Sequence, residues 1–137
     1  MPLSSSLRAL IEAGPIAHLV TLGPDGAPHV SLAWIGLDGD DVVIGTMFDQ
    51  LKLHNIRRDP RVALSFETGA TNAMGLNGYI VLHGRARLTD GGAPELLNRL
   101  AQIYIGPGAT MPTAPAGWVI RITVDRVTGS DVTRVDD

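Results

Sequence analysis

Apolar and polar residues alternate, or apolar residues run together, over several short segments rich in Val, Ile and Thr and bounded by Gly, Pro or Asp. This pattern is typical of β-strands. It predicts six strands, at 16–22, 28–35, 41–47, 62–67, 78–89 and 118–127, and the last can extend toward Val132. The polar turns at 23–26 and 38–40 are too short to hold a helix, so the first three strands should form an antiparallel meander.

Three segments show helical spacing in place of alternation. Ser4 to Ala13 opens on a Ser suited to an N-cap, and Pro94 to Tyr104 carries a stripe of Leu and Ile. Asp49 to Arg58 is predicted as a short helix capped by Asp49. Gly106 to Gly117 combines Pro, Ala and Gly without a period, which predicts a surface loop.

The predicted fold class is mainly β with a few helices. Six antiparallel strands in 137 residues must protect their edges, and closure into a small barrel achieves this. The length fits one domain over residues 1–137. A doubly wound parallel sheet is disfavoured, because it would need a helix between most pairs of strands.

Composition excludes several classes of function. A formal charge of -3 argues against a general nucleic-acid binder, and the absence of Cys excludes disulfides, thiolate zinc sites and cysteine nucleophiles. Apolar runs such as Tyr79 to Leu82 are far shorter than the ~20 residues that span a bilayer, and the N-terminus lacks the apolar core of a signal peptide. We therefore expect a cytoplasmic protein without nucleic-acid or membrane partners.

Common catalytic templates are missing. The four His residues have no metal-ligand spacing, and the sequence contains no nucleophile elbow, Walker motif or dinucleotide fingerprint. No metal site is expected, and catalytic residues stay unassigned.

The informative residue is Lys52, the one Lys among eleven basic residues. It falls in the first turn of the helix predicted after the third strand, where backbone N–H groups and an ammonium together suit a phosphate. The alternative is a solvated basic helix face, since Arg57, Arg58 and Arg61 share the segment.

The segment around Lys52 resembles a known family. Several stretches resemble motifs of the pyridoxamine 5'-phosphate oxidase-like split β-barrel proteins. They are Thr46, Lys52, Asn55-Ile56, Arg58-Asp59-Pro60-Arg61-Val62-Ala63 and the segments 25–31, 83–88 and 119–129. The resemblance implies a six-stranded antiparallel split β-barrel. It also implies a homodimer that binds a flavin or deazaflavin between subunits, with the cofactor phosphate on the Lys52 segment.

Within that superfamily the short chain is most similar to deazaflavin (coenzyme F420)-dependent oxidoreductases. Such an enzyme would transfer a hydride between the reduced cofactor and a small conjugated or heteroaromatic substrate. Gln50 departs from the pattern, because many relatives have Ser or Arg there. An FMN-dependent oxidoreductase and a non-catalytic flavin or deazaflavin carrier therefore remain as alternatives.

The resemblance also implies which residues bind the cofactor. They are Val30, Ser31, Leu32 and Ala33 in the second strand, Gly45 and Thr46 in the third, Gln50, Leu51, Lys52, Asn55 and Arg57 in the helix, and Asn77 and Tyr79. In the second strand, the face with Ser31 and Ala33 is small enough to leave room for a flat ring, although simple strand packing would also explain it. In relatives, the loop before Tyr79 reaches the cofactor of the neighbouring subunit.

Three further expectations concern aromatic and charged side chains. Trp34 and Trp118 are expected in the core or at a dimer contact. Arg57, Arg58 and Arg61 could receive the carboxylates of a deazaflavin tail. A proton for the product could come from His29, Tyr79 or water, and the sequence does not choose among them.

Overall fold

The computed structural model describes residues 1–136, which fold mainly as β-structure. The elements follow one another in the order α1 (Ser5–Glu12), β1 (Ala17–Leu22), β2 (Pro28–Ala33), β3 (Gly36–Asp38), β4 (Asp41–Thr46), α2 (Leu51–Arg58), β5 (Arg61–Thr71), β6 (Asn77–Asp90), α3 (Ala93–Tyr104), β7 (Trp118–Thr128) and the 3-10 helix η1 (Val132–Val135). None of these helices is long and apolar enough to cross a membrane.

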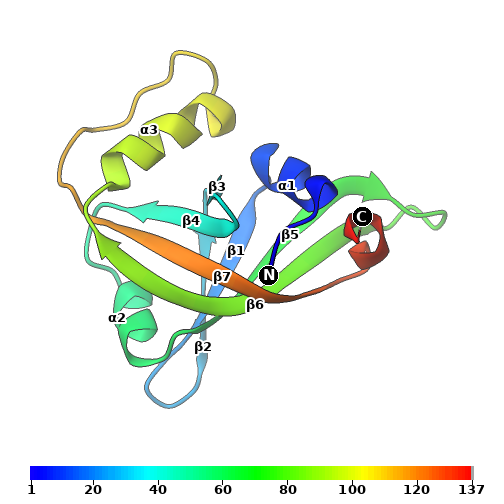
Figure 1. The fold of residues 1–137 in the computed structure, drawn as a ribbon, viewed down its shortest axis with the longest axis horizontal. Coiled ribbons are helices and arrows are strands. Elements are labelled where there is room, and N and C mark those ends of the chain that lie inside the picture. The colour runs from blue at the N-terminus through cyan, green and yellow to red at the C-terminus, as the bar shows by residue number, and fades with distance from the viewer. Residues whose placement is uncertain (137) are drawn as a thin grey trace.

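All seven strands belong to one antiparallel sheet with the order β2-β1-β5-β6-β7-β4-β3, which coils strongly around its inner face (Figure 1). Strands that are far apart in the sequence also pair: β4 lies beside β7, with Gly45 opposite Val119 and Thr46 opposite Trp118. The two edge strands, β2 and β3, are consecutive in the chain and joined by Trp34 and Ile35. Within residues 1–136 these edges do not pair with each other, so the barrel is split, as predicted.

The strand count differs from the six predicted. The segment 28–35 is not one strand, because β2 ends at Ala33 and the chain then forms the short β3, which pairs with β4 through Gly36 and Val43. The predicted meander of the first three strands is therefore wrong: β2 pairs with β1, whereas β4 pairs with β3 and β7 at the other side of the sheet. The predicted extension toward Val132 is wrong. The strand β7 ends at Thr128, and a turn leads into η1.

The helices fall where the sequence predicts them, with one correction. The Ser4 hydroxyl accepts a hydrogen bond from the Leu7 amide at 3.1 Å and so caps α1 as expected. The cap of α2 is not Asp49 but Gln50, whose side chain makes no capping hydrogen bond. The Asp49 carboxylate instead contacts His54 at 3.1 Å, and this ion pair accounts for the failed prediction.

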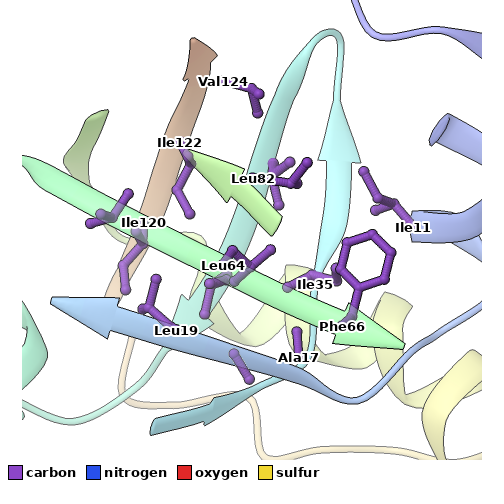
Figure 2. Packing of buried hydrophobic residues seen from close by; sticks show 14 of the residues in the cluster. Ile11, Ala17, Leu19, Ile35, Leu64, Phe66, Leu82, Ile120, Ile122 and Val124 are labelled. Atoms are coloured by element: carbon purple, nitrogen blue, oxygen red, sulfur yellow. The ribbon is translucent and has the colours of Figure 1, made fainter. Parts of the chain in front are cut away.

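The main core lies inside the coiled sheet, where buried side chains such as Leu19, Leu64 and Ile120 pack together and α1 adds Ile11 (Figure 2). The helix α3 lies over β4 (Figure 1). It forms a second, smaller cluster in which Leu96 and Leu100 pack on strand residues. The helix α2 packs against β1 and β6. Thus α3 packs on β4, the neighbour of the edge strand β3, and α2 packs on β1, the neighbour of the edge strand β2.

Candidate functional site

A cavity of about 440 Å³ lies at the split, where the ends of β2 and β4 meet α2 and α3. Its lining is mostly apolar, and Lys52 is the charged residue in it. The lining residues are Ile16, Leu32, Ala33, Trp34, Ile44, Gly45, Lys52, Leu97, Tyr104 and Met111. A small-molecule site commonly combines apolar walls with a few placed polar groups in this way.

Lys52 is an unusual lysine because it is almost entirely buried, with 9% of its surface exposed. No hydrogen bond or ion pair to its ammonium occurs within the described part of the chain. Desolvation lowers the pKa of Lys52 below its ordinary value. A buried, unpaired cation is costly, so an anionic ligand that pairs with it would be favoured.

The start of α2 adds to this preference for an anion. The helix has no side-chain cap and no acidic residue in its first turn. Its first backbone N–H groups carry the positive end of the helix dipole, and no side chain caps them, because the nearby Asp49 carboxylate contacts His54 and Arg57. Lys52 stands in this first turn, so the two features act on the same ligand.

Three buried polar atoms have no hydrogen-bond partner among the described residues: His29 Nδ1, Ser31 Oγ and Thr46 Oγ1. They lie on β2 and at the end of β4, the strands that border the cavity. Because buried polar groups in proteins are nearly always paired, these atoms are suited to a bound ligand. Together with Lys52 they fit the phosphorylated, flat-ringed cofactor that the family resemblance implies. No group of three or more His, Asp or Glu in residues 1–136 is arranged to hold a metal ion.

The other end of the cavity has aromatic walls. The rings of Trp34 and Tyr104 stack with their centroids 5.2 Å apart and an interplanar angle of 9°. The Tyr104 hydroxyl donates to the Pro15 carbonyl at 2.6 Å and accepts from the Ile35 amide at 3.1 Å. The hydroxyl therefore has both a donor and an acceptor partner within the chain. Burial raises the pKa of Tyr104, and the hydrogen bond with Ile35 opposes part of this rise.

The helix α3 and the loop after it complete this apolar end. A Cβ at Gly45 would lie 3.0 Å from Leu97 Cγ, so glycine allows α3 to approach β4 closely. The Asn98 side chain accepts a hydrogen bond from the Met111 amide at 2.8 Å and holds the loop against α3. Met111 thereby forms part of the wall.

Eight of the residues expected to bind cofactor gather around this site. Leu32, Ala33, Gly45 and Lys52 line the cavity, and Ser31 and Thr46 supply unpartnered hydroxyls beside it. Gln50 and Leu51 are exposed at the start of α2. Val30 lies two residues from Leu32 on the outer face of β2, where it is exposed.

Asn55 and Arg57 do not line the cavity. Asn55 is fully buried, and its amide donates to Thr21 Oγ1 at 3.0 Å. The Arg57 guanidinium lies over the Trp118 ring, 5.6 Å from its centroid, and 3.7 Å from the Asp49 carboxylate. Both side chains are therefore occupied by contacts within the chain.

The predicted basic face for a cofactor tail is also largely paired internally. Arg58 donates to the Leu22 carbonyl at 2.9 Å. Arg61 binds the Asp59 carboxylate through two nitrogens, and these hydrogen bonds lower the pKa of Asp59 to about 2. Any tail carboxylate would have to compete with these partners.

Asn77 and Tyr79 belong to a different part of the chain. They begin β6 in the long β5–β6 hairpin, which extends away from α2 (Figure 1). Tyr79 is 47% exposed and borders a second hollow with Ile16 and His18. Ile16 also lines the main cavity, so the two hollows adjoin along one outer face.

The sequence reasoning missed the apolar half of the cavity. Leu97 belongs to the recognised apolar stripe of α3, but its place beside Gly45 depends on how α3 packs on β4. Trp34 packs against the second core cluster, in line with the expected core position, and its stacking on Tyr104 at the cavity was not foreseen. Nothing in the aperiodic segment 106–117 pointed to Met111.

Comparison with known proteins agrees with this architecture. The chain is 24% identical to an F420 reductase, with a TM-score of 0.72 over 88% of this chain and 94% of that one. A putative pyridoxamine 5'-phosphate oxidase from Listeria innocua has 17% identity and a TM-score of 0.67 over 90% and 94% of the two chains. A conserved hypothetical protein from Mycobacterium tuberculosis has 24% identity and a TM-score of 0.68 over 89% and 80%. These similarities establish the fold.

Sequence comparison gives the family directly. No curated protein matches the chain. The profile of the pyridoxamine 5'-phosphate oxidase family, however, matches residues 3–131, which include every strand described above. The chain therefore belongs to the pyridoxamine 5'-phosphate oxidase family of flavin-binding split-barrel proteins, which includes oxidoreductases.

Proposed function

We propose that the protein is a coenzyme F420-dependent oxidoreductase that holds the cofactor phosphate at Lys52. The observation that carries this proposal is the unpaired ammonium of Lys52, on a largely buried side chain at the uncapped start of α2. The unpartnered hydroxyls of Ser31 and Thr46 beside it suit further polar contacts with the cofactor. The similarity of the fold to an F420 reductase adds support.

The chain's own contribution is to bind, to orient and to exclude water. When bound, the reduced cofactor supplies the hydride. Lys52 would fix the phosphate, and the apolar walls formed by Trp34, Leu97 and Met111 would hold a flat ring and a small conjugated substrate out of water.

A homodimer is part of this proposal. Large apolar side chains are exposed on β2, just before β1 and near the start of β6, namely Val30, Leu32, Ile16 and Tyr79. A second copy of the chain would cover these side chains and bring its own Asn77 and Tyr79 toward the cavity. This arrangement would explain why those two residues lie apart from Lys52 in a single chain.

FMN is the second candidate cofactor. Gln50, at the N-cap of α2, supplies no charge for a phosphate, but both cofactors carry one, so this residue does not distinguish them. One observation favours FMN. The arginines proposed for an anionic deazaflavin tail have partners within the chain. FMN lacks that tail and would not need them.

Paired titrations of the protein with F420 and with FMN, followed by fluorescence, test the choice of cofactor. Tighter binding of F420, with reductase activity on a panel of conjugated substrates, is expected. Binding of F420 without activity would indicate a carrier, and tighter binding of FMN would indicate the flavin enzyme.

The phosphate site is tested separately. Lys52→Ala should weaken binding of the preferred cofactor by about 10- to 100-fold, the equivalent of one charge-assisted hydrogen bond. Arg85→Ala, which removes an exposed cation from the middle of β6, serves as the control and should bind like the parent. Equal binding by Lys52→Ala and the parent would refute the assignment.

A further inference from the structure

A buried polar network lies between α2 and the end of β1. Thr21 on β1 and Asn55 on α2 both have 0% of their surface exposed, and the Asn55 amide donates to Thr21 Oγ1 at 3.0 Å. The same network includes Arg58, whose Nη2 donates to Asn55 Oδ1 at 3.0 Å and to the Leu22 carbonyl at 2.9 Å. Side chains of α2 are thus joined to the side chain and the backbone of β1.

This network is close to Lys52 along the helix. Asn55 follows Lys52 by three residues, which places the two side chains on the same face of α2, and both are buried. Fixing Asn55 therefore fixes the rotation of α2 about its axis and its height above β1. The direction in which the Lys52 ammonium enters the cavity depends on both.

We infer that Asn55, Thr21 and Arg58 are positioning residues that hold α2 so that Lys52 meets the phosphate of the cofactor. This inference rests on the proposed function. It replaces the expectation that Asn55 itself contacts the cofactor, because the Asn55 amide is turned to Thr21 and Arg58 and no part of the residue is exposed.

A network that merely stabilised the fold would affect all ligands alike. A network that positions Lys52 should affect the phosphate and spare the ring. Two ligand pairs separate these cases: FMN with riboflavin, and F420 with its deazaflavin core lacking the phosphate and tail. The measured quantity is the ratio of the two dissociation constants in each pair. It reports the contribution of the phosphate in the FMN pair, and that of the phosphate together with the tail in the F420 pair.

The first variant is Thr21→Val, which keeps the shape of the side chain and removes the acceptor for Asn55. We expect it to reduce the contribution of the phosphate by about 3- to 10-fold and to leave binding of the phosphate-free ligand within about twofold. Thr21→Ser, which retains the hydroxyl, should restore the parental ratio.

Thr128→Val is the matched control, because it removes one side-chain hydrogen bond, to His83, from β7. Its ratio should equal that of the parent.

Arg58→Ala removes the exposed side chain that bonds Asn55 and the Leu22 carbonyl, and it provides an independent test if Thr21→Val does not fold. It should lower the ratio in the same direction. In a Lys52→Ala background, Thr21→Val should change the ratio by less than about twofold, because the network acts through Lys52.

Three outcomes would overturn the inference. Parental ratios in both Thr21→Val and Arg58→Ala would show that the network is only structural. An undiminished effect of Thr21→Val in the Lys52→Ala background would show that it does not act through Lys52. If the unmodified protein bound both phosphorylated ligands no better than their phosphate-free partners, the phosphate site would fail, and the inference would fail with it.

Discussion

Lys52 combines two properties that oppose each other in an empty site. Its side chain is buried, yet its function in the proposed site requires a positive charge. Desolvation lowers its pKa, and a bound phosphate would raise that pKa again by pairing with the ammonium. Binding of the phosphate and binding of a proton should therefore be linked.

This linkage predicts a pH dependence of cofactor binding. As the pH rises through the lowered pKa of Lys52, the free protein loses its charge and the affinity for FMN should fall. The fall should begin at a lower pH than for an ordinary lysine, whose pKa is 10.5. Titrations of FMN and riboflavin from pH 7 to pH 10 test this, and riboflavin controls for the titration of the ring itself. Parallel curves for the two ligands would contradict the prediction.

Asp59 and Arg61 show the opposite linkage at acid pH. Hydrogen bonds from Arg61 lower the pKa of Asp59 to about 2, from an ordinary value of 3.8. The pair therefore stabilises the fold above about pH 4, and this stabilisation is lost as the pH falls from 4 through 2. Asp59→Asn should melt below the parent at pH 6, and the difference should shrink by pH 2. A constant difference in melting temperature across that range would argue against the pair.

At the scale of elements, α3 is attached to the split largely through Tyr104. Its hydroxyl joins the end of the helix to Pro15, before β1, and to Ile35, between β2 and β3. Its ring stacks on Trp34. One side chain therefore connects the apolar wall of the cavity to both edges of the barrel.

Tyr104→Phe keeps the ring and removes the hydroxyl. Because the Ile35 amide and the Pro15 carbonyl would both lose a partner, the free energy of unfolding should decrease by about 1–3 kcal/mol. Urea unfolding measures this change. Tyr79→Phe, at an exposed tyrosine, is the matched control and should differ from the parent by less than about 0.5 kcal/mol. Equal effects of the two substitutions would contradict the role given to Tyr104.

The elements could be predicted where the sequence pattern is local. Ser4 and the apolar stripes specified α1 and α3, and the polar turns specified the β1–β2 and β3–β4 hairpins. They did not specify a three-strand meander, because β2 and β4 do not pair. The break between β2 and β3 was missed because the apolar run through Trp34 and Ile35 continues without a turn residue. Asp49 was misassigned because its pairing with His54 is a side-chain contact that competes with capping.

The sequence pointed to most of the residues of β2, β4 and α2 that line the cavity, and it did not point to those of α3 and the loop after it. Lys52 and the residues near it in sequence form one local unit, α2, so the motif identified them. Tyr104 and Met111 reach the cavity through long-range packing of α3 on β4, which no local pattern encodes. The hydrogen bond from Asn55 to Thr21 could not be predicted either, since 34 residues separate the two in the chain.

At the scale of the whole molecule, the exposed apolar face predicts self-association. Light scattering at micromolar concentration should give about twice the 14.5 kDa of one chain. Val30→Glu would place a charge on this face and should produce monomers with weakened cofactor binding. Ile105→Glu, at an exposed apolar residue just after α3, is the control and should remain dimeric. A monomeric parent would remove the composite site from the proposal.

The pairing of β4 with β7 also bears on the order in which the protein folds. Gly45 and Val119 face each other across this pair, although 74 residues separate them in the chain. Such distant contacts form slowly, because a long loop must close before they gain any stability. The β1–β2, β3–β4 and β5–β6 hairpins can form from local contacts, whereas β4 joins the rest of the sheet only when it pairs with β7. Cofactor binding during refolding would therefore report a late event, and the cofactor would act on the native state by mass action instead of guiding the early chain.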